Sequence, residues 1–585
     1  MRVPAFLCLA ALAAPTLVPG ISSAQVATPE ECGGPGGGES HVTEAGPHAI
    51  GRSDVVELES KVDGAVVQIG FVRPDVPASV ETPVIVDAGP YFWSDLKDTD
   101  LTTCNSFLVE NYVPHGYTVA FVPTRGAGDS DSCADLMGPK ERSDLDQAIA
   151  WLGEQPWSGG SVGMTGISYD GSTPWEVAAS GNPYLKTIVP AEGVIDLYSL
   201  IYRSGRADSR WWLFVPGYQW DYNTVTANPT NGRDPTHWAN AAVCEDVVAG
   251  LAATAETYAT GEDDSFGYWT ERNSRPGTEK RYEGSIFVVQ GLQDWNVVPS
   301  QVLPWVNKLE RKGAHVKMML GQWQHSWPDT AGNGEGTLRW DYADILLRWW
   351  DRWLKRRPRG PLGPRVEVQD SDGRWRTSAS WPPANAAETK LFLEPTALRG
   401  TASGAEERTT LAPSARSRYI YINDSTNQSE TPLESTCTTC AVFATARQEN
   451  DLHVSGIPTL DLTVVPHGSG GNVSAYLYRA EGESGYRLIG WGSADVRFPD
   501  GGHEAAPVTP GEEMELAFDM EPLDAVVHEG ERLVLVLDQG NTNDMPGPPA
   551  FPVDLAYGGA KSSFTFPVVS PEQESYFTPP PNPDP

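Results

Sequence analysis

One short turn of the sequence combines a serine with the glycines that a nucleophile turn requires. Residues 166–171 read Gly-Ile-Ser-Tyr-Asp-Gly and follow an apolar segment that ends at Thr165. They nearly fit the G-x-S-x-G pattern of a nucleophile elbow, with the second glycine one residue late. A serine hydroxyl is a poor nucleophile unless a tight turn exposes it beside a base. We therefore predict that Ser168 is a nucleophile; the alternative is a glycine-rich turn with an incidental serine.

An activated serine needs a histidine and an acid, which on an α/β sheet follow it in the order acid, histidine. Asp294 comes after the apolar segment 286–289, and His325 comes after the segment 316–320. His315 is the only other histidine that follows Asp294 within the predicted α/β region. It precedes its strand, whereas catalytic loops follow parallel strands. We predict Asp294 as the orienting acid and His325 as the base. Taken singly, Asp294 could be a turn residue and His325 a surface or core histidine.

Acyl transfer also needs hydrogen-bond donors for the developing oxyanion. An elbow offers the backbone N–H of the residue after the serine, which is Tyr169 here. A second donor should lie after an earlier strand, and the Tyr91 hydroxyl follows the apolar segment 84–86. We predict Tyr169 and Tyr91 as the oxyanion hole. Without that role, Tyr91 is an amphipathic tyrosine on a loop.

The elements that must position these residues alternate between strand and helix. Six short apolar segments without clear alternation are typical of buried parallel strands. A helix capped by Ser143 is predicted between two of them, because Leu145, Ile149 and Leu152 have helical spacing. Strand, helix and strand in succession indicate an α/β sheet. The predicted strands are Val84–Val86, Thr118–Val122, Val162–Met164, Ile188–Val189, Ile286–Val289 and Val316–Leu320.

Two parts of the chain depart from this alternation of strands and helices. Residues 197–275 are rich in Trp, Tyr, Ala and Asp without a clear strand, so we expect a mostly helical cap over the site. A last helix is predicted over residues 341–357, where apolar residues form a stripe. Beyond it, strands such as Leu460–Val464 and Leu533–Leu537 alternate with turns, which predicts an all-β sandwich. The Pro-rich tail after Ser570 is expected to be disordered.

Composition excludes some classes of partner. The chain has 585 residues, 40% of them apolar, which is too long for one core and predicts two or three globular domains. The formal net charge of −35 argues against a nucleic acid or an anionic membrane as partner. We therefore expect a small substrate, no nucleic-acid partner and no membrane partner. The oligomeric state stays open.

The N-terminus and the cysteines indicate export. Arg2, an apolar run from Ala5 to Val18 and a small-residue sequence ending at Ala24 predict a signal peptide over residues 1–24, followed by a leader over 25–50. We expect a secreted, extracellular protein with three disulfides of open pairing. Residues 437–440 could instead be half of a zinc site or a redox pair, but no second cysteine pair or histidine cluster lies nearby. The remaining cysteines are Cys32, Cys104, Cys133, Cys244, Cys437 and Cys440.

Several stretches, in one order, resemble the X-prolyl dipeptidyl-peptidase and cocaine-esterase family of serine hydrolases across nearly the whole mature chain. The late Gly171 is similar to the G-x-S-Y-x-G elbow of that family. The matching stretches are Arg125–Gly128, Gln155–Trp157, Gly163–Gly171, Leu185–Pro190, Asp294–Val297 and Pro364–Val368.

The resemblance implies an α/β-hydrolase domain with a helical cap insertion, followed by a jelly-roll domain. The implied catalytic domain spans residues 51–196 and 276–358, with the cap at 197–275, the jelly roll at 359–570 and the tail at 571–585. It also implies Ser168, Asp294 and His325 as the triad, Tyr91 and the Tyr169 amide as the oxyanion hole, and no metal or organic cofactor. The jelly roll is expected to buttress the catalytic domain; a carbohydrate-binding role is the alternative.

The expected substrate is a peptide with a penultimate proline, or else an ester or a β-lactam side-chain amide. Trp295, Asn296 and Val297 look like the X-prolyl enzymes, in which the asparagine helps bind the substrate amine and its neighbours line the proline pocket. The carboxylate that should neutralise this amine is not located by matching; Glu192, Asp208, Asp221 and Glu271 are substitutes. The segment 321–326 looks closer to the esterase branch. A third hypothesis is a catalytically inactive binding protein.

Overall fold

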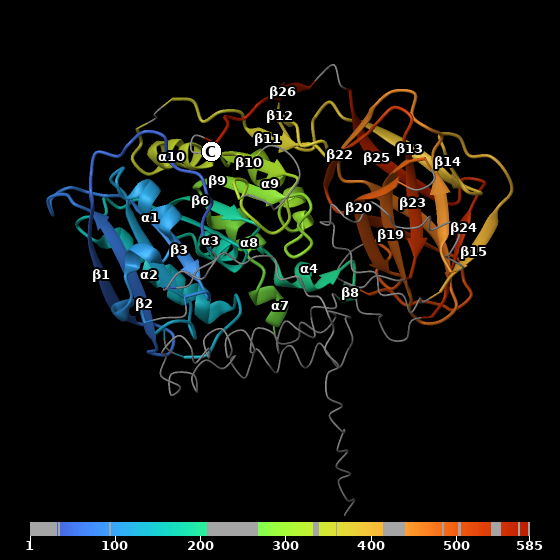
Figure 1. Cartoon of the computed structure of the whole chain (residues 1–585). Helices are drawn as coiled ribbons and strands as arrows, with labels where there is room; N and C mark the ends of the chain where they lie inside the picture. The colour runs from blue at the N-terminus through green and yellow to red at the C-terminus, as the bar shows by residue number, and fades with distance from the viewer. Residues whose placement is uncertain are drawn as a thin grey trace, which may run out of the picture.

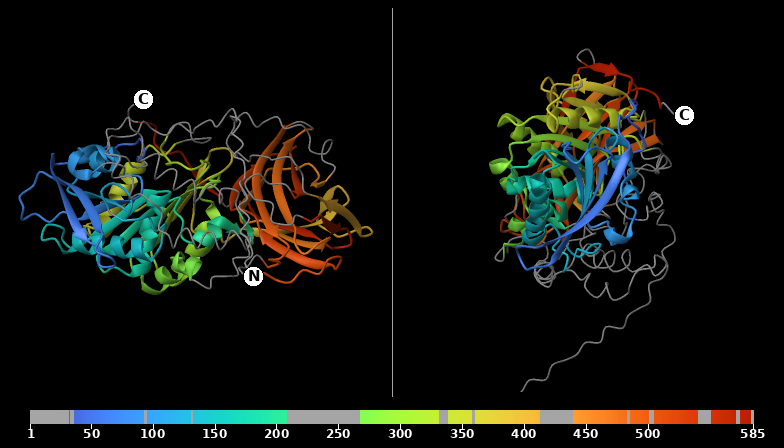
Figure 2. Two further views of the ribbon diagram at one scale, coloured as in Figure 1. Left: turned by 90° about the horizontal axis from the view of Figure 1, so that it is seen from below. Right: turned by 90° about the vertical axis from the view of Figure 1, so that its left-hand side faces the viewer.

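The computed structural model describes two lobes, an α/β lobe and an all-β lobe, which lie side by side (Figures 1 and 2). The α/β lobe contains the N-terminal half of the chain, and the all-β lobe contains most of the C-terminal half. The described residues are 32, 36–92, 95–130, 132–207, 267–330, 338–357, 360–412, 439–482, 485–500, 505–539, 551–570 and 574–582.

An 11-stranded sheet forms the centre of the α/β lobe, and all six predicted strands belong to it. Its ladder is parallel from β4 to β11 and antiparallel at both edges. The predicted α/β class is therefore confirmed. In spatial order the strands are β1 (Ile50–Glu59), β2 (Val66–Pro74), β4 (Thr118–Pro123), β3 (Val84–Gly89), β5 (Val162–Ile167), β6 (Leu185–Ala191), β9 (Ser285–Gly291), β10 (Val316–Gly321), β11 (Val366–Gln369), β12 (Trp375–Ser378) and β26 (Ser575–Phe577).

Helices cover both faces of this sheet, each face with its own apolar core. On one face α2 (Pro139–Glu154), α3 (Tyr169–Ser180) and α9 (Leu303–Arg311) pack on the alternate strand residues. On the other face α1 (Ser106–Tyr112) and α10 (Tyr342–Trp353) do so. The central strands are buried on both faces, which explains their unbroken apolar sequence.

Helix α2 begins four residues before the predicted cap, so the prediction for Ser143 is wrong. Pro139 occupies the first helical position, where its fixed φ suits the helix and no N–H is needed. The side chain of Asp135 accepts hydrogen bonds from the backbone N–H groups of Lys140 (2.7 Å) and Glu141 (3.3 Å). The cap therefore comes from a residue four positions outside the helix.

The all-β lobe consists of mostly antiparallel strands around a separate apolar core. Its strands β18 (Thr459–Pro466) and β23 (Arg532–Asp538) contain the two segments predicted from sequence. The others are β13 (Ala387–Glu394), β14 (Ala397–Arg399), β15 (Glu407–Leu411), β16 (Ala441–Ala444), β17 (Leu452–Gly456), β19 (Asn472–Glu481), β20 (Gly485–Asp495), β21 (Met514–Asp519), β22 (Leu523–Val527), β24 (Val553–Tyr557) and β25 (Ser563–Val569).

The sheet of the α/β lobe continues past the boundary expected at residue 358. Strands β11 and β12 extend it, and β26 from the tail pairs with β12. Phe577 of β26 packs against Trp375 of β12, with ring centroids 6.4 Å apart. The tail therefore contains a strand where disorder was expected, because its aromatic side chain finds a distant apolar partner.

The predicted cap region is described only at its two ends. Helix α4 (Leu197–Ile201) and the short strands β7 (Tyr202–Arg203) and β8 (Arg206–Ala207) lead into it, and α7 (Tyr268–Glu271) leads out to α8 (Arg275–Arg281). Residues 208–266 lie outside the described residues.

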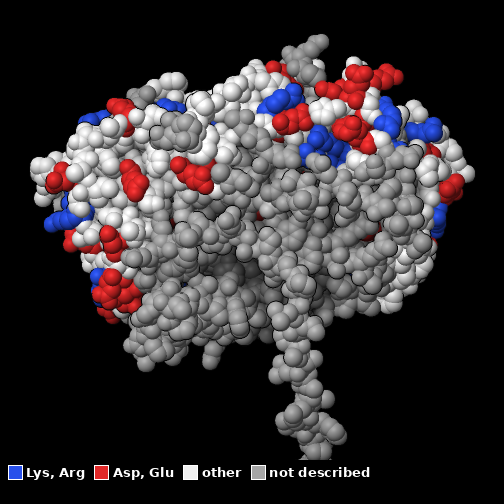
Figure 3. All heavy atoms as spheres, in the orientation of Figure 1, with Lys and Arg blue, Asp and Glu red and all other residues white. Residues whose placement is uncertain are grey.

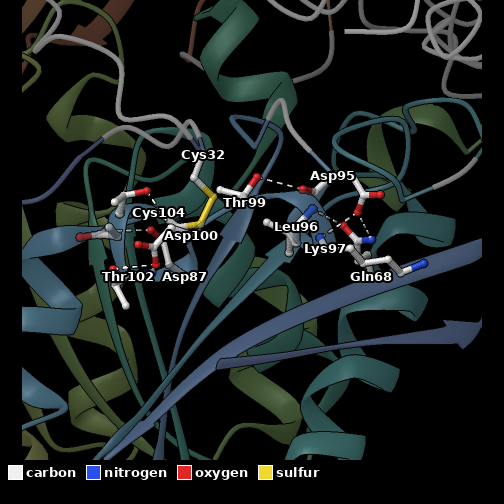
Figure 4. The surroundings of a disulfide bond; sticks show 12 residues. Cys32, Gln68, Asp87, Asp95, Leu96, Lys97, Thr99, Asp100, Thr102 and Cys104 are labelled. Carbon is white, nitrogen blue, oxygen red and sulfur yellow. Dashed lines mark hydrogen bonds between the residues drawn. A yellow bond between two sulfur atoms is a disulfide. The ribbon is translucent and has the colours of Figure 1, made fainter. Parts of the chain in front are cut away.

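A disulfide joins Cys32 to Cys104, immediately before α1 (Figure 4). It connects the N-terminal segment to the α/β lobe across 72 residues of sequence. Cys133 and Cys440 are also disulfide-bonded. Cys244 and Cys437 lie outside the described residues.

Candidate active site

Ser168 lies in the sharp turn between β5 and α3. Its φ of 63° and ψ of −121° are rarely adopted by a residue with a side chain, and such strain is typical of functional turns. A Cβ on Gly171 would lie 2.1 Å from the carbonyl oxygen of Ala191, so only glycine fits there. The Ser168 N–H donates to the same oxygen at 3.1 Å. The late glycine is thus required by the close approach of α3 to the end of β6.

The two predicted oxyanion residues flank the serine. The Tyr91 hydroxyl, on the loop after β3, donates a hydrogen bond to the Ser168 Oγ at 3.2 Å. Tyr169 is the first residue of α3, at the helix end where the dipole favours negative charge. Its hydroxyl donates to Glu141 at 2.9 Å and accepts from the Met137 N–H at 2.8 Å. The Tyr169 side chain is thereby fixed away from the serine.

Asp294 and His325 meet across the loops that follow β9 and β10. The Oδ2 of Asp294 lies 2.8 Å from the Nδ1 of His325. The other oxygen of Asp294 accepts the backbone N–H groups of Asn296 (2.7 Å) and Val297 (3.0 Å). Because Asp294 is buried and held by its own loop, it can fix the ring orientation and the tautomer of His325.

The remaining nitrogen of His325 is available for proton transfer. Its Nε2 is buried and has no hydrogen-bond partner among the described residues. Ser168 and His325 both flank the end of β6, since Ser168 bonds to Ala191 and His325 lies against the next residue, Glu192. In this structure the Ser168 Oγ bonds to Tyr91, and a serine–histidine hydrogen bond of this kind often forms only with substrate bound.

Glu192 is the site residue whose position the sequence reasoning missed. Its Oε2 lies 3.0 Å from the His325 Nδ1, and its Oε1 accepts the Gly291 N–H (3.1 Å) and the Trp323 Nε1–H (2.9 Å). Burial and the Asp294 charge raise the pKa of Glu192 to about 8. The available signal was an acid directly after a parallel strand, the same position that identified Asp294.

Electrostatics at His325 depends on which of these acids is charged. Burial opposes a charge on the ring, but Asp294 and Glu192 together raise the pKa of His325 to about 10. A charged Glu192 adds to this rise and would keep the ring protonated, which would prevent it from acting as a base. The raised pKa of Glu192 leaves Asp294 as the charged partner at neutral pH.

An apolar cluster lies beside the serine on the side of the cap region. It includes Tyr91, Tyr169, Val297 and Trp269, the last from α7. Val297 is buried, whereas Trp295 and Asn296 are half-buried on the same loop. The structure thus brings Val297 to the two oxyanion residues and leaves Trp295 and Asn296 nearer the surface.

The four acids considered as candidates for binding the substrate amine differ in their positions. Glu192 is turned toward His325, so its carboxyl group is engaged behind the triad. Glu271 is exposed at the end of α7. Asp208 and Asp221 lie outside the described residues.

Among the described residues, one group of side chains has metal-ligand geometry, with donor atoms of Glu192, Asp294 and His325 within 4.8 Å of one another. The two acids both face the Nδ1 of His325, so the group forms a hydrogen-bonded relay. Cys440, which sequence reasoning weighed as a zinc ligand, is disulfide-bonded. The arrangement is therefore suited to proton transfer at His325.

Comparisons with known proteins match both lobes. Residues 63–327 match the model described as X-Pro dipeptidyl-peptidase (S15 family). Residues 362–576 match the X-Pro dipeptidyl-peptidase C-terminal non-catalytic domain. The first match ends at residue 327, before α10, and the second begins at residue 362, just before β11.

Individual relatives come from both peptidase and esterase groups. The Xaa-Pro dipeptidyl-peptidase of Lacticaseibacillus casei is 23% identical, over 89% of this chain and 71% of that protein. The cocaine esterase of Rhodococcus sp. is 34% identical over 136 residues, 23% of each chain. A solved α-amino acid ester hydrolase has a TM-score of 0.62 and 17% identity, covering 90% of this chain and 96% of that one. This last likeness supports the fold, an α/β hydrolase followed by a β domain.

Proposed function

We propose that Ser168 is the acylated residue in this chain, which belongs to the X-Pro dipeptidyl-peptidase and cocaine-esterase family of serine hydrolases. The observation that carries the proposal is the strained Ser168 turn beside Tyr91 and the end of β6, with the Asp294–His325 pair on the next two strands. His325 would take the Ser168 proton through Nε2 and return it to the leaving group. Water would then hydrolyse the acyl-enzyme.

The oxyanion of the tetrahedral intermediate would be bound by the Tyr91 hydroxyl and the Tyr169 N–H. In the free enzyme the Tyr91 hydroxyl donates to the Ser168 Oγ. During attack the same hydroxyl can donate to the substrate oxygen, because that oxygen arrives next to the Oγ. Tyr91 would thus switch its acceptor without moving far.

The favoured substrate is a peptide with a free N-terminus and a penultimate proline. Val297, Tyr91 and Trp269 form an apolar and aromatic surface beside Ser168, which suits a proline ring. Asn296 lies next to Val297, half-buried, where its amide could bind the substrate amine. The likeness to an Xaa-Pro dipeptidyl-peptidase, which covers 89% of this chain and 71% of that protein, supports this choice over the shorter likeness to cocaine esterase.

Ester hydrolysis or α-amino-acid ester hydrolysis is the second candidate. The observation that favours it is the position of Glu192, the more buried of the two described substitute acids, which is engaged by His325 and does not offer its charge to a substrate amine. A site without such a carboxylate would gain less binding free energy from a free amine on the substrate. The substrate panel below separates the two candidates.

Labelling and substrate comparison test the proposal. A fluorophosphonate should label Ser168 in the native chain and not in Ser168→Ala, and the variant should keep its fold while losing turnover. Gly-Pro and Ala-Pro amides should be cleaved, and their N-blocked forms should not. Cleavage of aryl esters without cleavage of X-Pro amides would support the esterase instead. A protein that reacts with none of these probes would be the inactive binding protein.

The proposal extends to the type of β domain and to the cap over the catalytic domain. We propose that residues 359–570 are mainly a jelly roll that buttresses the catalytic domain of 51–196 and 276–358, and that residues 197–275 form a helical cap. Hydrogen bonds between the β lobe and both catalytic loops support the buttress. They offer no argument for a carbohydrate site.

Export is proposed from the N-terminal 24 residues and the disulfide Cys32–Cys104, which suits an oxidising compartment. None of the described helices has the length and apolar character needed to cross a membrane. Acidic and basic side chains are interspersed over the described surface in Figure 3, on a chain of net charge −35. A small peptide or ester substrate, with no nucleic-acid or membrane partner, is consistent with that surface.

A further inference from the structure

Two acids, Asp294 and Glu192, lie within hydrogen-bond distance of the same nitrogen of His325, its Nδ1. The Oε2 of Glu192 is 3.0 Å from the His325 Nδ1, compared with 2.8 Å for the Asp294 Oδ2. Both acid side chains are fully buried. A catalytic histidine needs one orienting acid, so the second requires its own explanation.

The backbone at Glu192 is strained and is held by tertiary contacts. Its φ of 48° is left-handed, which costs a non-glycine residue roughly 1–3 kcal/mol. Its N–H donates to the Val289 carbonyl at 3.0 Å, and the Val194 N–H donates to the Ser172 Oγ at 2.8 Å. A Cβ on the intervening Gly193 would lie 2.0 Å from the Gly171 carbonyl oxygen. The segment is therefore wedged between β9 and the nucleophile helix, and it aims Glu192 at His325.

The hydrogen bonds of Glu192 match a neutral carboxylic acid. Its Oε1 accepts two N–H groups, from Gly291 and Trp323, as a carbonyl oxygen would. The proton then belongs on Oε2, the oxygen that lies 3.0 Å from the His325 Nδ1. A second buried charge beside Asp294 would be strongly unfavourable.

The other groups around Glu192 offset that charge only in part. Among the described residues, His325 is the basic side chain that pairs with Glu192. From α10, the phenol of Tyr342 feels the charges of Asp329 and Glu192, which together with burial raise its pKa well above its usual range. Burial and Asp294 likewise raise the pKa of Glu192 to about 8. Burial and Asp294 therefore outweigh His325 and the Gly291 N–H, which favour the charged form, and the protonated acid is favoured.

We infer that Glu192 is a positioning residue that keeps its proton in the working enzyme and, with Asp294, holds the imidazole of His325 in place. The inference rests on the proposed role of His325 as the base. A neutral Glu192 restrains the ring without stabilising its protonated form. Beside one carboxylate instead of two, His325 loses its proton more readily and can accept the Ser168 proton, while Asp294 supplies the single charge that stabilises the imidazolium.

Two variants of Glu192 test this inference, with fluorophosphonate labelling, aryl-ester hydrolysis and Gly-Pro amide hydrolysis measured from about pH 5 to about pH 10. Glu192→Gln imitates the neutral acid, since its amide oxygen can accept both N–H groups and its NH2 can replace the hydroxyl. Glu192→Ala removes the support of the ring. Glu154→Gln, an exposed acid at the end of α2, is the matched control.

Glu192→Ala should lower the labelling rate and the kcat of both substrates by roughly 10- to 100-fold with little change in KM, because a misplaced base affects every acyl donor. Glu192→Gln should stay within about threefold of the native rate, with the acid limb of its pH profile unmoved, since no charge is removed. Melting curves verify that both variants fold.

Three results would overturn the inference. Native rates in Glu192→Ala would show that the ring needs no second support. An acid limb displaced to lower pH in Glu192→Gln would show that native Glu192 is charged. A raised KM for free-amine substrates alone, with unchanged labelling, would place Glu192 in the amine site. If the native chain itself is not labelled at Ser168, the proposed function fails instead, and the two failures are distinguishable.

Discussion

The side-chain amide of Gln322 donates a hydrogen bond of 3.1 Å to the backbone carbonyl of Asp524. Gln322 belongs to the loop that carries His325, and Asp524 belongs to β22 of the β lobe. A similar contact joins the loop of Asp294, because Ser300 donates through its N–H (3.1 Å) and its hydroxyl (3.0 Å) to Glu521. The β-lobe segment 521–524 thus fastens the acid loop and the base loop together.

Gln322→Ala should lower both kcat and stability. It also removes the hydrogen bonds of the Gln322 side chain to Gln293 (2.8 Å) and to the Gln369 carbonyl (2.9 Å), at about 1 kcal/mol of stability for each bond, and the freed loop displaces His325 and should reduce kcat by roughly tenfold. Steady-state kinetics and melting curves measure the two effects. Glu513→Gln, which alters only exposed ion pairs of the β lobe, is the control. An unchanged kcat would show that the β lobe does not position the base.

Tyr91→Phe should reduce kcat by about 10²- to 10³-fold with little change in KM, because it removes one donor to the oxyanion. The ring itself keeps its packing in the apolar cluster, so the fold should be retained. Tyr184→Phe, on the loop before β6, serves as the matched control. Equal losses in kcat and affinity, or no loss, would contradict the assignment of Tyr91 to the oxyanion hole.

Gly171→Ala should destabilise the catalytic lobe by about 3 kcal/mol or more, because the new Cβ would collide with the Ala191 carbonyl oxygen at 2.1 Å. Relaxation would push α3 from β6 and displace Ser168 as well. Thermal unfolding and fluorophosphonate labelling should both report the change. Gly400→Ala, with open space around the new Cβ, should leave both unchanged. A stable and active Gly171→Ala would refute the packing argument.

His453 should make the stability of the protein depend on alkaline pH. Burial opposes its charge, but the carboxylates of Asp524 and Glu574, 2.7 and 2.6 Å from its nitrogens, raise its pKa to about 9. The stabilisation is fully present below the unfolded value of about 6.5 and is lost as pH rises through about 9. It should amount to the order of 3 kcal/mol.

Melting curves of the native chain and His453→Gln, recorded across this range, measure that dependence. The melting temperatures should differ most at the acid end and converge above the folded pKa of His453. His467→Gln, a more exposed histidine paired with Asp554, is the comparison and should show a small effect throughout. A difference between native and His453→Gln that grows with pH would contradict the assigned sign.

Removal of the disulfide by the double change Cys32→Ser and Cys104→Ser should lower stability by roughly 2–5 kcal/mol, because the bond closes a long loop. Activity at moderate temperature should remain, since neither cysteine lies among the site residues. Melting curves with and without a reductant provide the measurement. A reductant should lower the melting temperature of the native chain more than that of the double variant. The drop that remains in the double variant measures the effect of the other disulfides.

Strand ends explain why much of the site could be predicted. Ser168, Asp294 and His325 each follow a short apolar segment, and parallel strands bring their carboxyl ends to one edge of the sheet. A local pattern was therefore sufficient to place Asp294 against His325. Tyr91 could be proposed by the same rule, and the structure places its hydroxyl on the Ser168 Oγ.

Contacts between distant segments could not be predicted in this way. The cap of α2 comes from Asp135 rather than Ser143, the sheet gains β26 from the tail, and Glu192 faces His325 rather than a substrate amine. Each depends on which partner lies opposite in space, and local composition carries no information about that partner.

The sequence by itself determined the class of the sheet and the chemistry of the site, because apolar runs, turn glycines and strand-end residues act locally. Only the tertiary structure decided why Gly171 comes late, where the Glu192 carboxyl group lies and how the β lobe contacts the loops of Asp294 and His325. Those properties depend on close packing between segments far apart in the chain, where a single Cβ or a single buried charge decides what fits.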